Sequence, residues 1–200
     1  MVHATARAFK FIGALGGCAA TALCTLYISQ SAAQTGKEGP PQNSAVVETG
    51  NASPIYGVTI PVGYRDWKLI SVNHLVTGKL DQLRAQLGND IAMKAIREGK
   101  LPFPDGAIIV ALHWNHVPSE ENNKVLDAAF PGAQSFVAAS AVNVQVMVKD
   151  SKKYAATGGW GFADFKDGKP GDRALHETCF PCHAPAKARD FIFAHYAPTP

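Results

Sequence analysis

The C-terminal stretch contains two cysteines and a histidine at a spacing that can do chemistry. Cys179 and Cys182 lie three residues apart, and His183 follows directly. Residues three apart on a helix share one face, so both sulfurs can reach the two vinyl groups of one porphyrin. The next imidazole can then bind the iron as the proximal axial ligand. C-x-x-C-H is the attachment pattern of a c-type haem, so the sequence predicts one covalent haem c, with its iron bound by His183.

Three other kinds of site use the same residue types. A zinc site could join the two cysteines to His113 and His116, which form an H-x-x-H pair. A thiol–disulfide exchange enzyme could use the C-F-P-C segment, but such enzymes carry the dithiol early in a βαβ unit. Here only residues 184–200 follow the motif. A structural disulfide is the third alternative, and we rank haem c ahead of all three.

A haem attached so near the end of the chain restricts the choice of a sixth iron ligand. No methionine follows His183 in the sequence. The upstream candidates are Met93, Met147, His74, His113, His116 and His176, and His195 lies downstream. Methionines in apolar patterns are mostly core residues, and lone histidines are mostly surface or core residues. The sequence therefore predicts iron with one protein ligand and an open distal face.

The N-terminal residues 1–33 have the pattern of a secretory signal peptide. Arg7 and Lys10 precede an uncharged apolar run over residues 11–28, and small residues precede a cleavage site after Ala33. The apolar run is also long enough for an uncleaved membrane anchor, which is the alternative. We expect export to the periplasm, the compartment in which haem c is attached.

Cleavage at this site changes what the chain can do. It removes Arg7, Lys10 and two of the four cysteines but no acid, so the formal charge falls from +3 to +1. A nearly neutral chain lacks the basic surface that nucleic-acid binding needs, and two cysteines make no disulfide framework. Residues 34–53 are rich in Gly, Pro, Ser and Asn and read as a flexible leader. Residues 54–200 suit one domain.

The elements that must position the cluster are short strands and helices. Apolar and β-branched patterns predict strands, and capping and stop signals predict helices. The expected strands cover residues 66–76, 107–114, 142–150 and 159–165, and the expected helices cover residues 89–100 and 172–182. This mixture predicts an α+β fold with a mainly antiparallel β-sheet, short helices and a C-terminal haem-binding helix.

Four blocks of the sequence resemble the cytochrome P-460 family. They read YRDWKLI, GKLPFPDGAIIVALHW, VMVKDSKKYAATGGWGFADF and CFPCHAPAKARDFIFAHYAP, and the similarity runs from Tyr64 to Pro198. The resemblance implies an α+β fold with a β-sheet core, a homodimer and one five-coordinate haem c. Members of this family oxidise hydroxylamine or nitric oxide, and the related cytochromes c′-beta bind nitric oxide or carbon monoxide.

The resemblance also assigns the distal residues. The lysine that the enzymes join to the porphyrin falls at Ala111, a distal arginine at Arg84, and a distal acid at Gln145. An amide cannot take the proton that a general base must accept, and alanine cannot form the lysine bond. We therefore expect a cytochrome that binds a small ligand such as nitric oxide or passes electrons to a redox partner protein. Oxidation of hydroxylamine or nitric oxide is the alternative.

Overall fold

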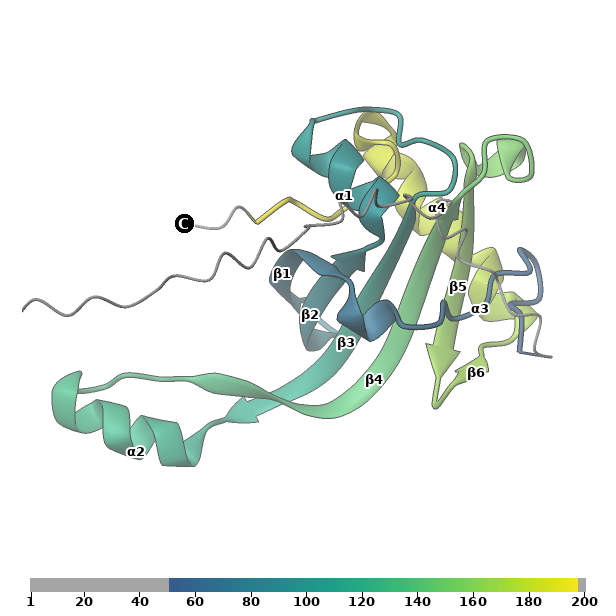
Figure 1. Ribbon diagram of the computed structural model, residues 1–200. Coiled ribbons are helices and arrows are strands. Elements are labelled where there is room, and N and C mark those ends of the chain that lie inside the picture. Colours follow the sequence, from purple (N-terminus) through teal and green to yellow (C-terminus); the bar gives the residue numbers. More distant parts are fainter. Residues whose placement is uncertain (1–50, 198–200) are drawn as a thin grey trace, which may run out of the picture. The chain divides into compact units, whose positions relative to one another are not determined.

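The computed structural model describes residues 51–197, so the signal peptide and most of the leader lie outside the described residues. One six-stranded antiparallel sheet dominates, and its strands are neighbours in chain order (Figure 1). The strands are β1 (Lys68–Val76), β2 (Asp81–Gly88), β3 (Ile108–Pro118), β4 (Phe136–Lys149), β5 (Trp160–Lys166) and β6 (Lys169–Pro170). The predicted α+β class is confirmed.

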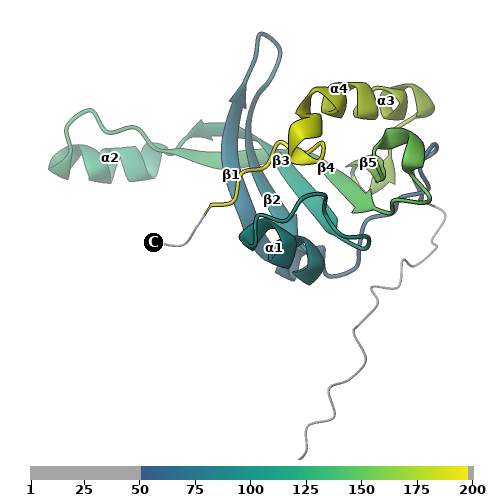
Figure 2. The ribbon, with the colours of Figure 1, turned by 90° about the horizontal axis from the view of Figure 1, so that it is seen from above.

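Four short α-helices accompany the sheet in the described part of the chain. They are α1 (Asp90–Arg97), α2 (Glu120–Ala129), α3 (Arg173–Glu177) and α4 (Cys179–His183), with 3₁₀ turns at Tyr64–Asp66, Ala155–Thr157 and Ala184–Arg189. Figure 2 shows α3 and α4 end to end beside the sheet, and both contact β5. Among residues 51–197, none of the helices combines the length and apolar character required to cross a bilayer.

The predicted helix over residues 89–100 is confirmed as α1, and its boundaries follow from local chemistry. The Asn89 side chain accepts a hydrogen bond from the Ala92 backbone N–H at 3.0 Å, so it caps the helix. Gly99 follows the helix with φ +61°, the left-handed conformation that ends many helices. Met93 is buried as a core residue, whereas Ile91 is exposed.

Three elements were missed, namely β2, α2 and the two-residue strand β6, and one expected helix is divided in two. Nothing in the sequence marked β2 as a strand, because its Gln, Arg and Leu residues are good helix formers and only pairing with β1 and β3 makes them extended. The helix α2 was also missed. The expected helix over residues 172–182 is interrupted at Thr178, so the cysteine cluster forms a helix of its own instead of ending a longer one.

Alternation along the central strands gives the sheet two different faces. Val146 and Val148 pack on one face with the segment before β1, including Val58. Met147 and Ile109 pack on the other face, against α1 and the C-terminal segment. Successive side chains of a strand point to opposite faces, so the alternation in residues 142–148 predicted this division. Ser53 is buried, and its hydroxyl donates to the Phe162 carbonyl, so the last residue of the expected leader is packed against β5.

β3 and β4 continue beyond the other strands as a two-stranded arm that ends in α2 (Figure 1). None of the residues of α2 is buried. Several large apolar side chains of the arm are exposed, namely Val117, Val125, Phe130, Phe136 and Val137.

A buried ion pair joins the end of β4 to the C-terminal segment. Lys149 Nζ lies 2.8 Å and 2.9 Å from the two carboxylate oxygens of Asp190, and it donates to the Gly158 carbonyl at 3.0 Å. The Lys149 and Asp190 side chains are only 4% and 7% exposed. Asp190 also accepts from the Phe103 backbone N–H, and the Lys149 ammonium lies over the Trp160 ring. Both charges therefore have several partners in place of water.

We predict that Asp190→Asn lowers the free energy of unfolding by about 3–5 kcal/mol, because it leaves the Lys149 charge buried without a counter-charge. Asparagine tolerates the left-handed backbone at this position, where φ is +51°, so the effect reports the charge. Lys68→Ala is the matched control, because the Lys68–Asp90 pair has side chains that are 59% and 92% exposed. It should cost less than about 1 kcal/mol. Equal effects of the two substitutions in denaturant unfolding would contradict this account.

Candidate functional site

The cysteine–histidine cluster lines a cavity of about 440 Å³ between the C-terminal helices and one face of the sheet. Such a volume is within the range of about 300–1,000 Å³ that is usual for small-molecule and cofactor sites. Its walls combine residues from β1 to β5 and the turn between β1 and β2, from α3, α4 and Thr178 between them, and from the segment after the last 3₁₀ turn. All three predicted haem-binding residues, Cys179, Cys182 and His183, belong to this wall.

The two cysteines are free thiols in different surroundings. Cys179 is half-buried and Cys182 is exposed. Burial raises the pKa of the Cys179 thiol to about 11, with smaller contributions from Asp164 and Cys182. A dithiol enzyme needs the opposite, a thiol whose pKa is lowered so that the thiolate forms near neutral pH. Disulfide exchange is thus not supported by this geometry.

His183 is oriented by a backbone hydrogen bond. Its Nδ1 lies 2.7 Å from the Phe191 carbonyl oxygen, which can only accept, so Nδ1 carries the proton and donates. Burial lowers the pKa of the imidazole, and this hydrogen bond acts in the opposite direction. The ring packs between Phe162 and Phe193. Nε2 is then the unprotonated nitrogen of a neutral imidazole, which is the form that binds a metal.

The floor of the cavity is a row of side chains on four neighbouring strands. Gln86 lies opposite Ala111, Ala111 opposite Gln145, and Gln145 opposite Asp164. All four residues line the cavity. The positions assigned to Ala111 and Gln145 from the resemblance are therefore neighbours in the site, although the sequence did not reveal their pairing.

Asp164 is the carboxylate that sequence reasoning missed. It is buried, and its Oδ2 accepts from the side-chain amides of Asn143 at 2.6 Å and Gln145 at 2.9 Å. Two amide donors stabilise a carboxylate away from water. The resemblance puts the enzymes' distal acid at Gln145 on β4, where this chain has an amide, and a carboxylate stands on the adjacent strand β5. Within the sequence, Asp164 was one residue in an expected strand, and no signal marked it.

Arg84, the expected distal arginine, also reaches the cavity. It donates to Gln82, whereas its Nε is buried and has no hydrogen-bond partner. Burial lowers the pKa of this guanidinium. A buried, unpaired donor is costly, so Arg84 suits a site whose occupant supplies an acceptor. Beside it lies His113, whose pKa is lowered to about 4 by burial and by the Arg84 charge.

Of the seven possible sixth ligands, only Met147 and His113 line the cavity. Met93 is in the core. His176 is fully buried, and its two nitrogens are bonded to the Asp172 carbonyl and the Asp164 backbone N–H. The other three are exposed or bonded elsewhere, namely His74 and His116 to Asp81 and His195 to Arg189.

The zinc alternative is not supported, because His116 is held by Asp81 and does not line the cavity with the cysteines.

Most of the chain matches the model of a known protein family. The model of the family described as Cytochrome P460 matches residues 61–194, which include the whole sheet and the cysteine cluster. No curated protein matches the chain.

In chain prepared without haem, we predict that iodoacetamide alkylates Cys182 well before Cys179 at neutral pH. Cys182 is exposed, whereas the pKa of Cys179 is raised to about 11, so its reactive thiolate forms only as the pH approaches that value. Labelling of Cys179 should therefore increase steeply with pH, as followed by peptide mass spectrometry. Denatured chain, in which both sites should react alike, is the control. Equal labelling of both thiols in the folded chain at neutral pH would contradict the environment described for Cys179.

Proposed function

Because the chain belongs to the Cytochrome P460 family, which implies a haem cofactor, we propose that it carries one covalent haem c and that Cys179, Cys182 and His183 hold it. The observation that carries the proposal is that these three residues share the wall of one cavity. Each thiol would add across one vinyl group, forming a carbon–sulfur bond and passing its hydrogen to the other vinyl carbon, so no electrons are exchanged. When bound, the group supplies an iron centre that binds small ligands and changes oxidation state.

The residues of the cavity fit such a group. His183 presents an unprotonated Nε2, because its Nδ1 is engaged by the Phe191 carbonyl. The wall is largely apolar, from Ile109, Phe162 and Ile192 among others, which suits a flat hydrophobic ring. The unpaired Nε of Arg84 can donate to an acidic substituent or to a ligand.

As the primary function we propose binding of a small ligand such as nitric oxide, or electron transfer, at an iron with an open distal position. Support comes from the candidates for the sixth position. Five of the seven are engaged or placed elsewhere, and Met147 is packed in the core as well as lining the cavity. Export to the periplasm, a redox partner protein and a homodimer remain predictions from the sequence and the resemblance.

A second function is favoured by Asp164. Oxidation of hydroxylamine requires a base that removes protons from the substrate, and Gln145 cannot serve. The buried Asp164 carboxylate lines the same cavity, and Asn143 and Gln145 fix its position. The amide at residue 145 therefore does not remove the general base from the site, and the enzymatic alternative gains support that the sequence alone did not give.

We predict that haem is attached only through Cys179 and Cys182. Among the residues described, the cavity wall contains no lysine, and Ala111, to which the resemblance assigns the position of the enzymes' lysine, belongs to this wall. In protein from cells competent for haem attachment, tryptic mapping should find haem on the peptide with both cysteines alone. Cys179→Ala combined with Cys182→Ala should abolish haem staining on denaturing gels, whereas Ala111→Gly should not. Haem linked to a peptide containing Lys100 or Lys124 would contradict the prediction.

We predict that the ferric protein gives a high-spin electron paramagnetic resonance signal and that the ferrous protein binds nitric oxide. A purely low-spin signal at neutral pH would contradict the open position and would point to His113 or Met147 as ligand.

Mixing ferric protein with hydroxylamine and an electron acceptor separates the two functions. Steady turnover that falls by about 10²–10⁴-fold in Asp164→Asn, the range usual for a general base, would establish the enzyme. With no turnover in the unaltered protein, the enzyme proposal fails.

A further inference from the structure

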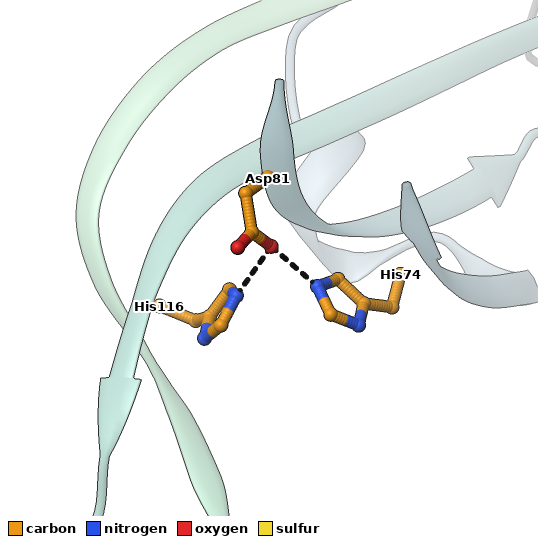
Figure 3. A group of neighbouring side chains, drawn as sticks. All are labelled: His74, Asp81 and His116. Atoms are coloured by element: carbon orange, nitrogen blue, oxygen red, sulfur yellow. Dashed lines mark hydrogen bonds and ion pairs between the residues drawn. The ribbon is translucent and has the colours of Figure 1, made fainter. Parts of the chain in front are cut away.

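Three side chains that the haem site does not use converge near the hairpin between β1 and β2. His74 comes from β1, Asp81 from the first residue of β2, and His116 from β3 (Figure 3). The strand register brings them together. His74 lies opposite Leu83, and Leu83 opposite Trp114, so the same register continued by two residues places Asp81 beside His116. Among positions 51–197, this is the only group of at least three His, Cys, Asp or Glu side chains whose possible ligand atoms lie so close together.

The geometry of the three groups is close. Nε2 of His74 and Nε2 of His116 each lie 2.6 Å from the same Asp81 oxygen, Oδ1. One ligand atom from each residue lies within 4.8 Å of the others. The rings of His74 and His116 are almost perpendicular, and both point toward Asp81 (Figure 3).

The cluster is separate from the haem cavity. None of its three residues lines that cavity. Leu75 on β1 and Arg84 on β2 do line it. His74 and Asp81 lie an odd number of residues away from Leu75 and Arg84, respectively, on the same strands. Alternation therefore directs them to the other face of the sheet. An ion bound there would not compete with the iron for ligands.

The donor set is one that zinc prefers. Two imidazole nitrogens and a carboxylate oxygen leave one position of a tetrahedron for water. Bonds of about 2.0–2.1 Å in a tetrahedron separate ligand atoms by roughly 3.3 Å, somewhat more than the present 2.6 Å contacts. To bind zinc, the His74 and Asp81 side chains would have to move apart slightly. They have room to do so, because they are 47% and 61% exposed. His116, 13% exposed and packed edge-on against Phe136, provides the fixed ligand.

Charge also favours a cation here. The Asp81 side chain contacts both imidazole rings, and a carboxylate there offsets part of the charge of a bound cation. Nδ1 of His116 is buried and has no partner. Without a second hydrogen bond to hold that ring, the affinity should be lower than in sites whose histidines are fully supported.

We propose that His74, Asp81 and His116 form a second metal site, which binds one zinc ion per chain on the face of the sheet opposite the haem cavity. The site would join three strands at the base of the β3–β4 arm. It does not depend on the proposed function, because its ligands are independent of the cysteine cluster.

The test uses haem-loaded protein purified without a histidine tag. Equilibrium dialysis against Zn²⁺, followed by metal analysis, should find one zinc per chain in addition to the haem iron, with the haem absorption spectrum unchanged. His74→Ala and Asp81→Asn should each weaken zinc binding by at least about tenfold. His195→Ala is the matched control, because His195 is exposed and outside the cluster, and it should bind zinc as the unaltered protein does.

Thermal unfolding gives an independent readout. Zinc that binds only the folded chain raises the unfolding temperature, so the increase should occur in the unaltered protein and in His195→Ala. It should be lost in His74→Ala and Asp81→Asn, whose unfolding without zinc also shows that both variants fold. The proposal is overturned if the unaltered protein binds no zinc, if all variants bind it equally, or if zinc binding displaces or alters the haem.

Discussion

The buried ion pair between Lys149 and Asp190 connects the sheet to the segment on which the haem site depends. Asp190 immediately precedes Phe191, whose carbonyl oxygen accepts the hydrogen bond from His183. The carboxylate also accepts from the Phe103 backbone, so one residue joins β4, the turn before β3 and the C-terminal segment. A charge at this depth is stable only when its partner stays in place. The orientation of His183, the proposed axial ligand, is therefore tied to the end of β4.

In the floor of the cavity, strand register brings together functional groups from residues that are far apart in the chain. A carboxylate on β5, an amide on β4 and an alanine on β3 form one row because the strands are antiparallel neighbours. The polar end of the row is satisfied internally, since Asn143 and Gln145 donate to Asp164. Arg84, whose Nε has no partner, also belongs to the wall. The cavity thus combines a fixed acceptor with an available donor.

The two faces of the sheet have separate chemical roles in this account. One face supplies the apolar and polar wall around the cysteine cluster. At the hairpin between β1 and β2, the opposite face carries the two histidines and the aspartate that we propose for zinc. Because successive residues of a strand alternate between faces, adjacent residues such as Asn73 and His74 belong to different environments.

The sequence by itself determined the fold class, the helix α1 and the C-x-x-C-H cluster from which we infer haem attachment, because each depends on residues close together in the chain. The C-x-x-C-H cluster lies within one short helix. The Asn89 cap accepts a hydrogen bond from a residue three positions later, and the alternation of apolar and polar residues in a strand can be read directly from the sequence. The tertiary structure decided the strand β2, the Gln145–Asp164 pair and the His74–Asp81–His116 cluster. Those features arise where strands pair, and register is set by contacts between residues tens of positions apart. No local pattern encodes such a contact, which is why the sequence showed an amide, Gln145, at the position of the enzymes' distal acid but did not show that the Asp164 carboxylate lies beside it.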